Sequence, residues 1–130
     1  MKMLKRFIAV ALLPLLLMAC SKDKHTDTPV TGTWNGLWGN DNATPIYLYR
    51  LNIKPGGVIE ELNAAGLVKG SGTWQLNGNS FTAHYQWKAP LSTVFTVAAT
   101  YNPASHSLSG TWGFDNSPTG GGTWHAEKND

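Results

Sequence analysis

The sequence has 130 residues, six tryptophans and a lone cysteine, which is enough chain for one domain and excludes a disulfide within it. Three of its ten basic residues, Lys2, Lys5 and Arg6, lie in the first 19 residues, which have the features of a targeting segment. The other 111 residues therefore carry seven basic and eight acidic side chains, a formal charge of −1. This balance argues against a nucleic-acid partner because no basic patch remains, and the 42% hydrophobic content excludes a disordered protein.

Residues 1–19 have the charge and hydropathy pattern of a leader peptide. The basic residues precede an apolar run, 7–18, that is shorter than the roughly 20 residues of a membrane-spanning helix. The run leads into Leu17-Met18-Ala19-Cys20, which resembles the lipobox of bacterial lipoproteins. The resemblance implies that the peptide is cut before Cys20 and that this cysteine carries acyl chains, which would hold the protein permanently on a membrane. The alternative is an ordinary secretory leader followed by an incidental cysteine.

Residues 20–30 are expected to form the lipidated N-terminus and a flexible tether. The segment is polar and has Pro29 near its end. By the same resemblance, Ser21 directly after the cysteine favours the outer membrane, on its periplasmic face or at the cell surface. The predicted partner of this segment is therefore the membrane, through the N-terminal lipid.

Residues 31–128 are expected to form a single all-β domain. All 14 glycines follow residue 31, β-branched and aromatic residues are frequent, and no stretch keeps a helical period. The eight expected strands are 31–39, 46–54, 58–63, 69–76, 80–88, 93–101, 107–114 and 122–128.

The short connections between these strands predict antiparallel neighbours, since parallel pairing needs long crossovers. Asn77-Gly78, between two alternating runs, predicts a hairpin with a type I′ turn. Eight such strands can form a closed up-and-down barrel or a two-sheet sandwich, and the short sequential turns favour the barrel. The predicted fold class is therefore an antiparallel, up-and-down, eight-stranded barrel.

Alternation of apolar and polar residues places large aromatic rings on the inner face of the predicted strands. The ten rings expected inside are those of Trp34, Trp38, Trp74, Trp87, Trp112, Trp124, Tyr47, Tyr49, Tyr85 and Tyr101. They could fill the core, or they could line a cup that stacks on a flat or apolar ligand, because an eight-stranded barrel is just wide enough for either. The candidate ligand-binding residues are Trp34, Trp38, Tyr47, Trp74, Trp87, Trp112 and Trp124.

A Gly-Thr-Trp motif recurs four times, ending at Trp34, Trp74, Trp112 and Trp124. We expect its glycine to share the inner face with the tryptophan, to leave room for the ring and to let the strand coil. The first copy, at 31–35, resembles the opening of avidin-type proteins, and Gly-x-Trp on a first strand is similar to the wider lipocalin-like (calycin) barrels and to small lipoproteins that contain them. This resemblance implies a lipocalin-like barrel over most of residues 31–128. Asn35 directly follows Trp34 and should point outward, so biotin binding is not carried over.

No catalytic or metal site is predicted. His84 and His125 are expected on the outer face and His106 at a turn, so no pair has metal-ligand spacing. Glu60 and Glu61 are adjacent on a strand and point to opposite faces, which excludes a carboxylate pair. We therefore expect no cofactor and no enzymatic activity.

Two classes of function stay open: a lipoprotein that binds a small apolar or aromatic ligand, and a filled barrel that serves as an envelope scaffold or as a protein-interaction or inhibitor module. For a cup, the rim is expected from loops 40–45, 64–66, 89–92 and 117–121, some of them at each end of the barrel. The mouth is expected at the end that carries 40–44. A ligand there would meet Trp38, with Tyr47 and Trp87, before the deeper Trp34.

Overall fold

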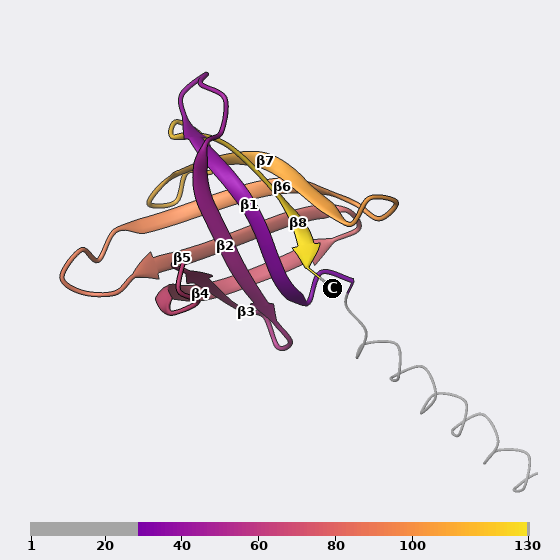
Figure 1. The fold of residues 1–130 in the computed structure, drawn as a ribbon, viewed down its shortest axis with the longest axis horizontal. Helices are drawn as coiled ribbons and strands as arrows, with labels where there is room; N and C mark the ends of the chain where they lie inside the picture. Colours follow the sequence, from indigo (N-terminus) through magenta and orange to yellow (C-terminus); the bar gives the residue numbers. More distant parts are fainter. Residues whose placement is uncertain (1–28, 130) are drawn as a thin grey trace, which may run out of the picture.

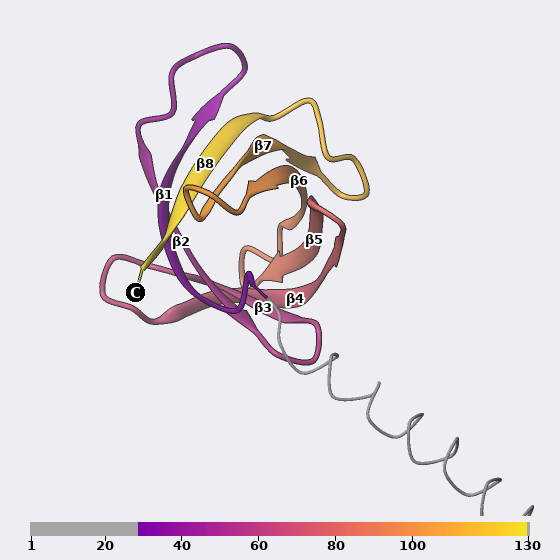
Figure 2. The same cartoon turned by 90° about the vertical axis from the view of Figure 1, so that its right-hand side faces the viewer.

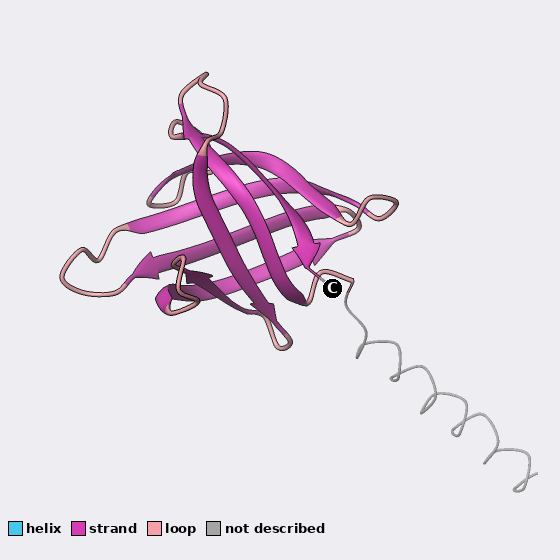
Figure 3. Ribbon diagram, in the orientation of Figure 1, coloured by secondary structure: helices cyan, strands magenta, loops and turns pink. Residues whose placement is uncertain are grey.

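Eight strands make up most of residues 29–129, the part of the chain that the computed structural model describes (Figure 3). Their bounds are β1 (Gly32–Asn40), β2 (Tyr47–Lys54), β3 (Val58–Leu62), β4 (Val68–Asn77), β5 (Ser80–Trp87), β6 (Val94–Asn102), β7 (Ser107–Phe114) and β8 (Gly122–Asn129). Each bound lies within one residue of the sequence prediction, and residues 29–129 contain no helix. The predicted leader, Cys20 and the tether up to residue 28 lie outside the described residues.

The strands form one closed barrel in which every strand is antiparallel to its sequence neighbour (Figures 1 and 2). Closure comes from the pairing of β8 with β1, which places Trp124 opposite Trp38. The prediction of an up-and-down barrel is therefore confirmed, and the sandwich is excluded because its two sheets would not pair into a single ring.

The β4–β5 hairpin is tight, as predicted, but its turn is of a different type. Asn77 pairs with Ser80, so the two central residues are Gly78 and Asn79 rather than the predicted Asn77 and Gly78. Gly78 has a φ of 61°, whereas Asn79 is not among the residues with positive φ. A positive φ at the first central position alone is typical of a type II′ turn, which glycine favours there, so the type I′ prediction was wrong.

The four longer connections all lie at one end of the barrel, which we call the rim end. They comprise residues 41–46, 63–67, 88–93 and 115–121, while the short turns 55–57, 78–79 and 103–106 lie at the opposite end (Figure 1). In an up-and-down barrel every second connection falls at the same end. The expectation that the rim loops would divide between the two ends was therefore wrong.

The end opposite the rim is filled by side chains and closed by the start of the described chain. Val30 is fully buried, and its carbonyl accepts a hydrogen bond of 2.8 Å from the Trp34 indole N–H. Lys128 Nζ donates to the Pro29 carbonyl at 3.3 Å. Val30 was placed in the tether by the sequence analysis, but here it belongs to the packed domain. We call this the closed end.

Glycines on the inner face let neighbouring strands approach closely. A Cβ at Gly72 would lie 2.0 Å from the His84 carbonyl oxygen, and one at Gly110 would lie 1.8 Å from that of Ala98. Both glycines precede a motif tryptophan by two residues. The expected role in coiling the strand fits this geometry. The expected role in making room for the tryptophan ring does not, because the nearest atoms belong to the adjacent strand.

Candidate ligand-binding cavity

A cavity of about 250 Å³ lies inside the rim end of the barrel. For comparison, an engineered apolar cavity of about 150 Å³ is large enough to take up benzene. The residues that line it come from β1, β2, β3, β5, β6 and β7 and from the loop before β6. They are Trp38, Asn40, Tyr49, Glu61, Tyr85, Trp87, Thr93, Phe95, Val97, Trp112 and Phe114. Because Asn40 and Phe114 are also exposed to solvent, the cavity opens to the outside at the rim.

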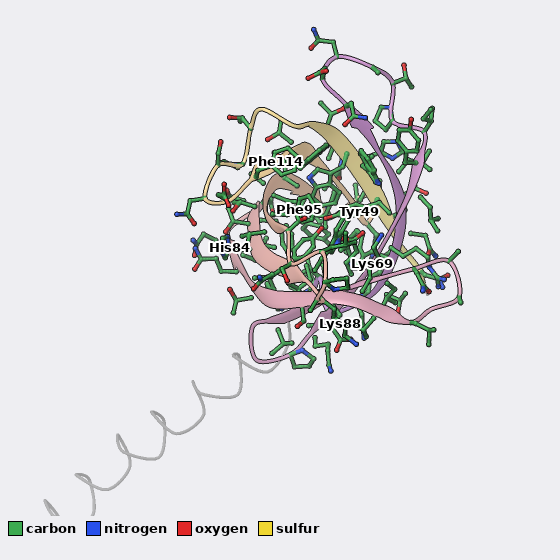
Figure 4. All side chains as sticks on the ribbon, turned by 90° about the vertical axis from the view of Figure 1, so that its left-hand side faces the viewer. Tyr49, Lys69, His84, Lys88, Phe95 and Phe114 are labelled. Atoms are coloured by element: carbon green, nitrogen blue, oxygen red, sulfur yellow. The ribbon has the colours of Figure 1, made fainter. Side chains whose placement is uncertain are left out.

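Aromatic rings form most of the cavity wall and pack against one another, mostly edge to face. The centroid of Trp112 lies 5.3 Å from that of Trp38 and 6.0 Å from that of Phe95. Phe95 also contacts Trp87, at 4.7 Å, and Phe114, at 5.7 Å. The Trp112 indole N–H donates to the Gly39 carbonyl at 2.9 Å, which fixes that ring. Figure 4 looks toward this end, with Tyr49 and Phe95 inside the ring of strands and Phe114 nearer its edge.

One carboxylate, that of Glu61 on β3, faces this aromatic cavity. Its side chain is almost fully buried, and Oε1 accepts a hydrogen bond of 2.8 Å from the Trp87 indole N–H. Ile59, two residues earlier, is buried on the same face. Glu60 lies on the outer face, where it contacts Asn52 and Lys54. The prediction that the two glutamates point to opposite faces is confirmed.

A β-bulge brings a lysine to Glu61. Glu61 pairs with Gly70 and Leu62 pairs with Val68, so Lys69 is an extra residue on β4 with no partner on β3. A bulge of this kind redirects a side chain that strict alternation would place elsewhere. Lys69 Nζ lies 3.5 Å from Glu61 Oε2 and 4.6 Å from the centroid of the Trp87 ring. Glu61, Lys69 and Trp87 therefore form a connected cluster at the edge of the cavity.

Two buried tyrosines extend this polar cluster. The hydroxyls of Tyr49 and Tyr85 are 2.8 Å apart and hydrogen-bonded. Burial raises the pKa of the Tyr49 hydroxyl, and the nearby Glu61 charge raises it further. Burial also raises the pKa of Tyr85, followed by the effects of Tyr49 and of Glu61. Both phenols are therefore neutral at physiological pH and present hydroxyl groups to the cavity.

Of the seven ring residues predicted as ligand-binding candidates, three line the cavity: Trp38, Trp87 and Trp112. Tyr47 does not line it. Its half-exposed ring packs on Trp38 at the rim, with the centroids 4.7 Å apart.

The other three candidates, Trp34, Trp74 and Trp124, do not line the cavity. Trp34 is fully buried beside Tyr101 near the closed end. Trp124 is buried in the core and donates to the Thr111 carbonyl at 2.9 Å. Trp74 stacks on Phe81, and its indole N–H donates to the Lys54 carbonyl. These three rings belong to the packed part of the barrel.

Glu61 and Lys69 are site residues that were not predicted from the sequence. Glu61 had a readable signal, because alternation places it on the same face as Ile59. Lys69 had none, since its direction depends on a bulge that period-2 alternation does not reveal. Tyr49 and Tyr85 were expected inside and lie there, but they were not among the candidates.

Each rim-end loop carries an exposed apolar side chain in the loop or next to it. These side chains are Ile46, Tyr47 and Leu48 at 41–46, Leu67 at 63–67, Leu91 at 88–93 and Phe114 at 115–121. Only one further large apolar side chain is exposed among residues 29–129, that of Val58. The exposed apolar side chains are therefore concentrated at the rim end, and one of them, Phe114, lines the cavity.

The histidines that the structure describes and Asn35 lie outside the cavity. His84 and His125 are exposed, as predicted, and His84 Nδ1 is hydrogen-bonded to the Thr96 hydroxyl on the outer face. Asn35 also points outward, where its side chain accepts a hydrogen bond from Arg50. Within the described residues, His, Cys, Asp and Glu side chains do not gather in a group suited to a metal ion. No helix in residues 29–129 has the length and apolarity needed to span a membrane.

The fold and the site define a small closed antiparallel barrel with a ligand-sized aromatic cavity at one end. Comparison with protein-family models, with curated proteins and with solved structures finds no match.

Proposed function

We propose that this protein is a lipid-anchored envelope protein whose barrel binds a small ligand with an apolar or aromatic body. The observation that carries the proposal is the cavity at the rim end, lined by Trp38, Trp87, Phe95, Trp112 and Phe114. Flat rings that are already braced by their neighbours can stack on a ligand with little ordering cost. Two phenol hydroxyls and the Glu61 carboxylate are the kind of few polar groups that orient a ligand in such a site.

The membrane part of the proposal rests on the lipobox-like Leu17-Met18-Ala19-Cys20 and on the resemblance to small lipoproteins with calycin barrels. The chain enters the barrel at the closed end, where Val30 is buried. An anchor at Cys20 would therefore join the barrel at the end away from the cavity, which leaves the mouth accessible to a ligand.

We propose binding rather than catalysis because the charged group of the cavity is already engaged. Glu61 accepts from the Trp87 N–H and is paired with Lys69. The lining residues otherwise offer hydroxyls, an amide and apolar side chains, with no base positioned to activate a nucleophile.

A protein-interaction module is the second candidate, and one observation favours it. The exposed apolar side chains Ile46, Leu67, Leu91 and Phe114 gather at the rim end, where they could contact a partner protein. This reading differs from the first in its expectation for small molecules, because it requires no ligand inside the barrel.

Tryptophan fluorescence separates the two candidates. The chain from Ser21 onward, which lacks only the leader and the acylated cysteine, is titrated with fatty acids, aromatic metabolites and biotin. The ligand-binding proposal expects quenching that saturates, because a bound ligand contacts three indole rings. If no compound binds more tightly than about 100 μM, roughly −5.5 kcal/mol, the ligand-binding proposal fails.

A further inference from the structure

The cavity has one charged lining residue, Glu61, and everything else around it is aromatic, aliphatic or neutral and polar. Among residues 29–129, every buried side-chain nitrogen or oxygen has a hydrogen-bond partner. The Glu61 carboxylate is therefore held in place by its partners. Its carboxylate is oriented from the side by the Trp87 N–H. The cavity is therefore lined by one negatively charged side chain, and aromatic rings surround that charge.

The contacts of Lys69 show that the Glu61 carboxylate attracts a cation. Its ammonium lies 3.5 Å from Glu61 Oε2 and 4.6 Å from the centroid of Trp87, so a cation is already held by a carboxylate and the face of an indole ring. Lys69 does not line the cavity, and 39% of its side chain is exposed. The Glu61 end of this ion pair is buried, so the carboxylate must keep a cationic partner, whereas the partly exposed Lys69 ammonium can be hydrated if another cation takes its place.

The rings beside Glu61 suit a second cation entering from the cavity. The negative faces of Trp, Tyr and Phe rings attract ammonium groups, and Trp does so most strongly. Trp38, Trp87 and Trp112 all line the space that Glu61 faces. Tyr49 and Tyr85 add neutral hydroxyl oxygens that can accept hydrogen bonds from an ammonium group. An anionic ligand would instead be repelled by the Glu61 carboxylate.

We propose that the cavity binds a small organic cation, a protonated primary or secondary amine on an aromatic or apolar body. The ammonium group pairs with Glu61 in place of Lys69, which swings out into solvent, and the body of the ligand stacks on the tryptophans. This inference rests on the proposed ligand-binding function and assigns the chemical class of its ligand.

Three probes that share one body test the assignment by calorimetry on the chain from Ser21 onward. They are 2-phenylethylammonium, the neutral 2-phenylethanol and the anionic 3-phenylpropionate. We expect the cation to bind about tenfold or more tightly than either of the others, since a hydrogen bond to a charged group is worth on the order of one decade in affinity.

Two variants with opposite expected effects sharpen this experiment. Glu61→Gln keeps an oxygen for the Trp87 N–H but removes the charge, so it should cost the cation about tenfold in affinity and leave the alcohol within about threefold. Lys69→Gln removes the internal competitor, so it should strengthen binding of the cation. If Glu61→Gln does not fold, by circular dichroism, the direction of the Lys69→Gln effect decides alone.

The inference is overturned if the alcohol or the anion binds as tightly as the cation, or if Lys69→Gln leaves cation binding unchanged or weaker. Either of those results keeps the ligand-binding proposal, because a probe still occupies the cavity. If none of the three probes binds, the cation assignment fails, and the broader fluorescence screen then decides whether the ligand-binding proposal fails with it.

Discussion

Two tryptophans of the first strand serve different purposes although both point inward. Trp34 is fully buried near the closed end and donates to the Val30 carbonyl, whereas Trp38 is half-buried and lines the cavity. We therefore expect Trp34→Ala to lower the free energy of unfolding by about 3–5 kcal/mol, the range for large aromatic deletions in a core. Trp38→Ala should cost less than about 2 kcal/mol and should weaken ligand binding. Urea denaturation and fluorescence titration measure the two effects, and an equal loss of stability in both variants would contradict the distinction.

Alkaline stability depends on the two buried phenols. Burial raises the pKa of Tyr49 and Tyr85 above the ordinary value of about 10. In the unfolded chain these groups lose their protons near pH 10, while in the folded protein they keep them, so the stability they contribute is present below pH 10 and falls as the pH rises above it. We expect Tyr49→Phe to flatten this alkaline decline, followed by denaturation at several pH values. Tyr47→Phe, at a half-exposed position, is the control, and an unchanged slope in Tyr49→Phe would contradict the assignment.

At the scale of the strand, close contact between β4 and β5 depends on Gly72. A methyl group there would lie 2.0 Å from the His84 carbonyl oxygen and 2.5 Å from the Tyr85 Cα, both backbone atoms that cannot move aside alone. We expect Gly72→Ala to destabilise the barrel by about 1–3 kcal/mol or more, as for an overpacked core. Ser71→Ala, at the exposed neighbouring position, should stay within about 0.5 kcal/mol. Thermal unfolding compares them, and equal stability of the two variants would disprove the strand contact.

Strand existence, order and facing could be predicted from the sequence because alternation is strict on most strands. Phe81, Ala83 and Tyr85 share the buried face of β5, as expected from their spacing. The turn after β4 was assigned to the wrong central residues because Asn77 and Asn79 both flank Gly78, and the sequence does not show which of them ends the strand. The end at which each connection lies could have been predicted from the sequence, because in any up-and-down barrel of eight strands every second connection, four of the seven, lies at the same end.

The site was less predictable than the strands. Alternation correctly identified Trp38, Trp87 and Trp112 as inward-facing rings. It could not show that these three line a cavity, whereas Trp34 and Trp124 are buried in the packed core. That outcome depends on how side chains from opposite walls meet across the barrel. The direction of Lys69 depends on a one-residue bulge, for which pairing register rather than local sequence is the evidence.

At the scale of the molecule, the barrel has a filled end where the chain enters and a hollow end with longer loops. Together with the lipobox-like residues 17–20, this arrangement leads us to expect a membrane-bound protein whose mouth points away from its attachment. Cys20→Ala should leave an unprocessed precursor or release the protein from the membrane, as measured by fractionation and by the mass of the N-terminus. Normal processing and membrane retention of this variant would contradict lipidation at Cys20.

On the proposed function, a small molecule occupies the rim end and not the packed remainder of the barrel. The six indole N–H groups report on this directly in a proton–nitrogen NMR spectrum, since Trp38, Trp87 and Trp112 line the cavity and Trp34, Trp74 and Trp124 do not. On saturation with a bound compound from the fluorescence screen, we expect the resonances of the first three to move and those of the other three to stay. Shifts confined to Trp34, Trp74 and Trp124, or equal shifts at all six, would contradict a ligand site at the rim end.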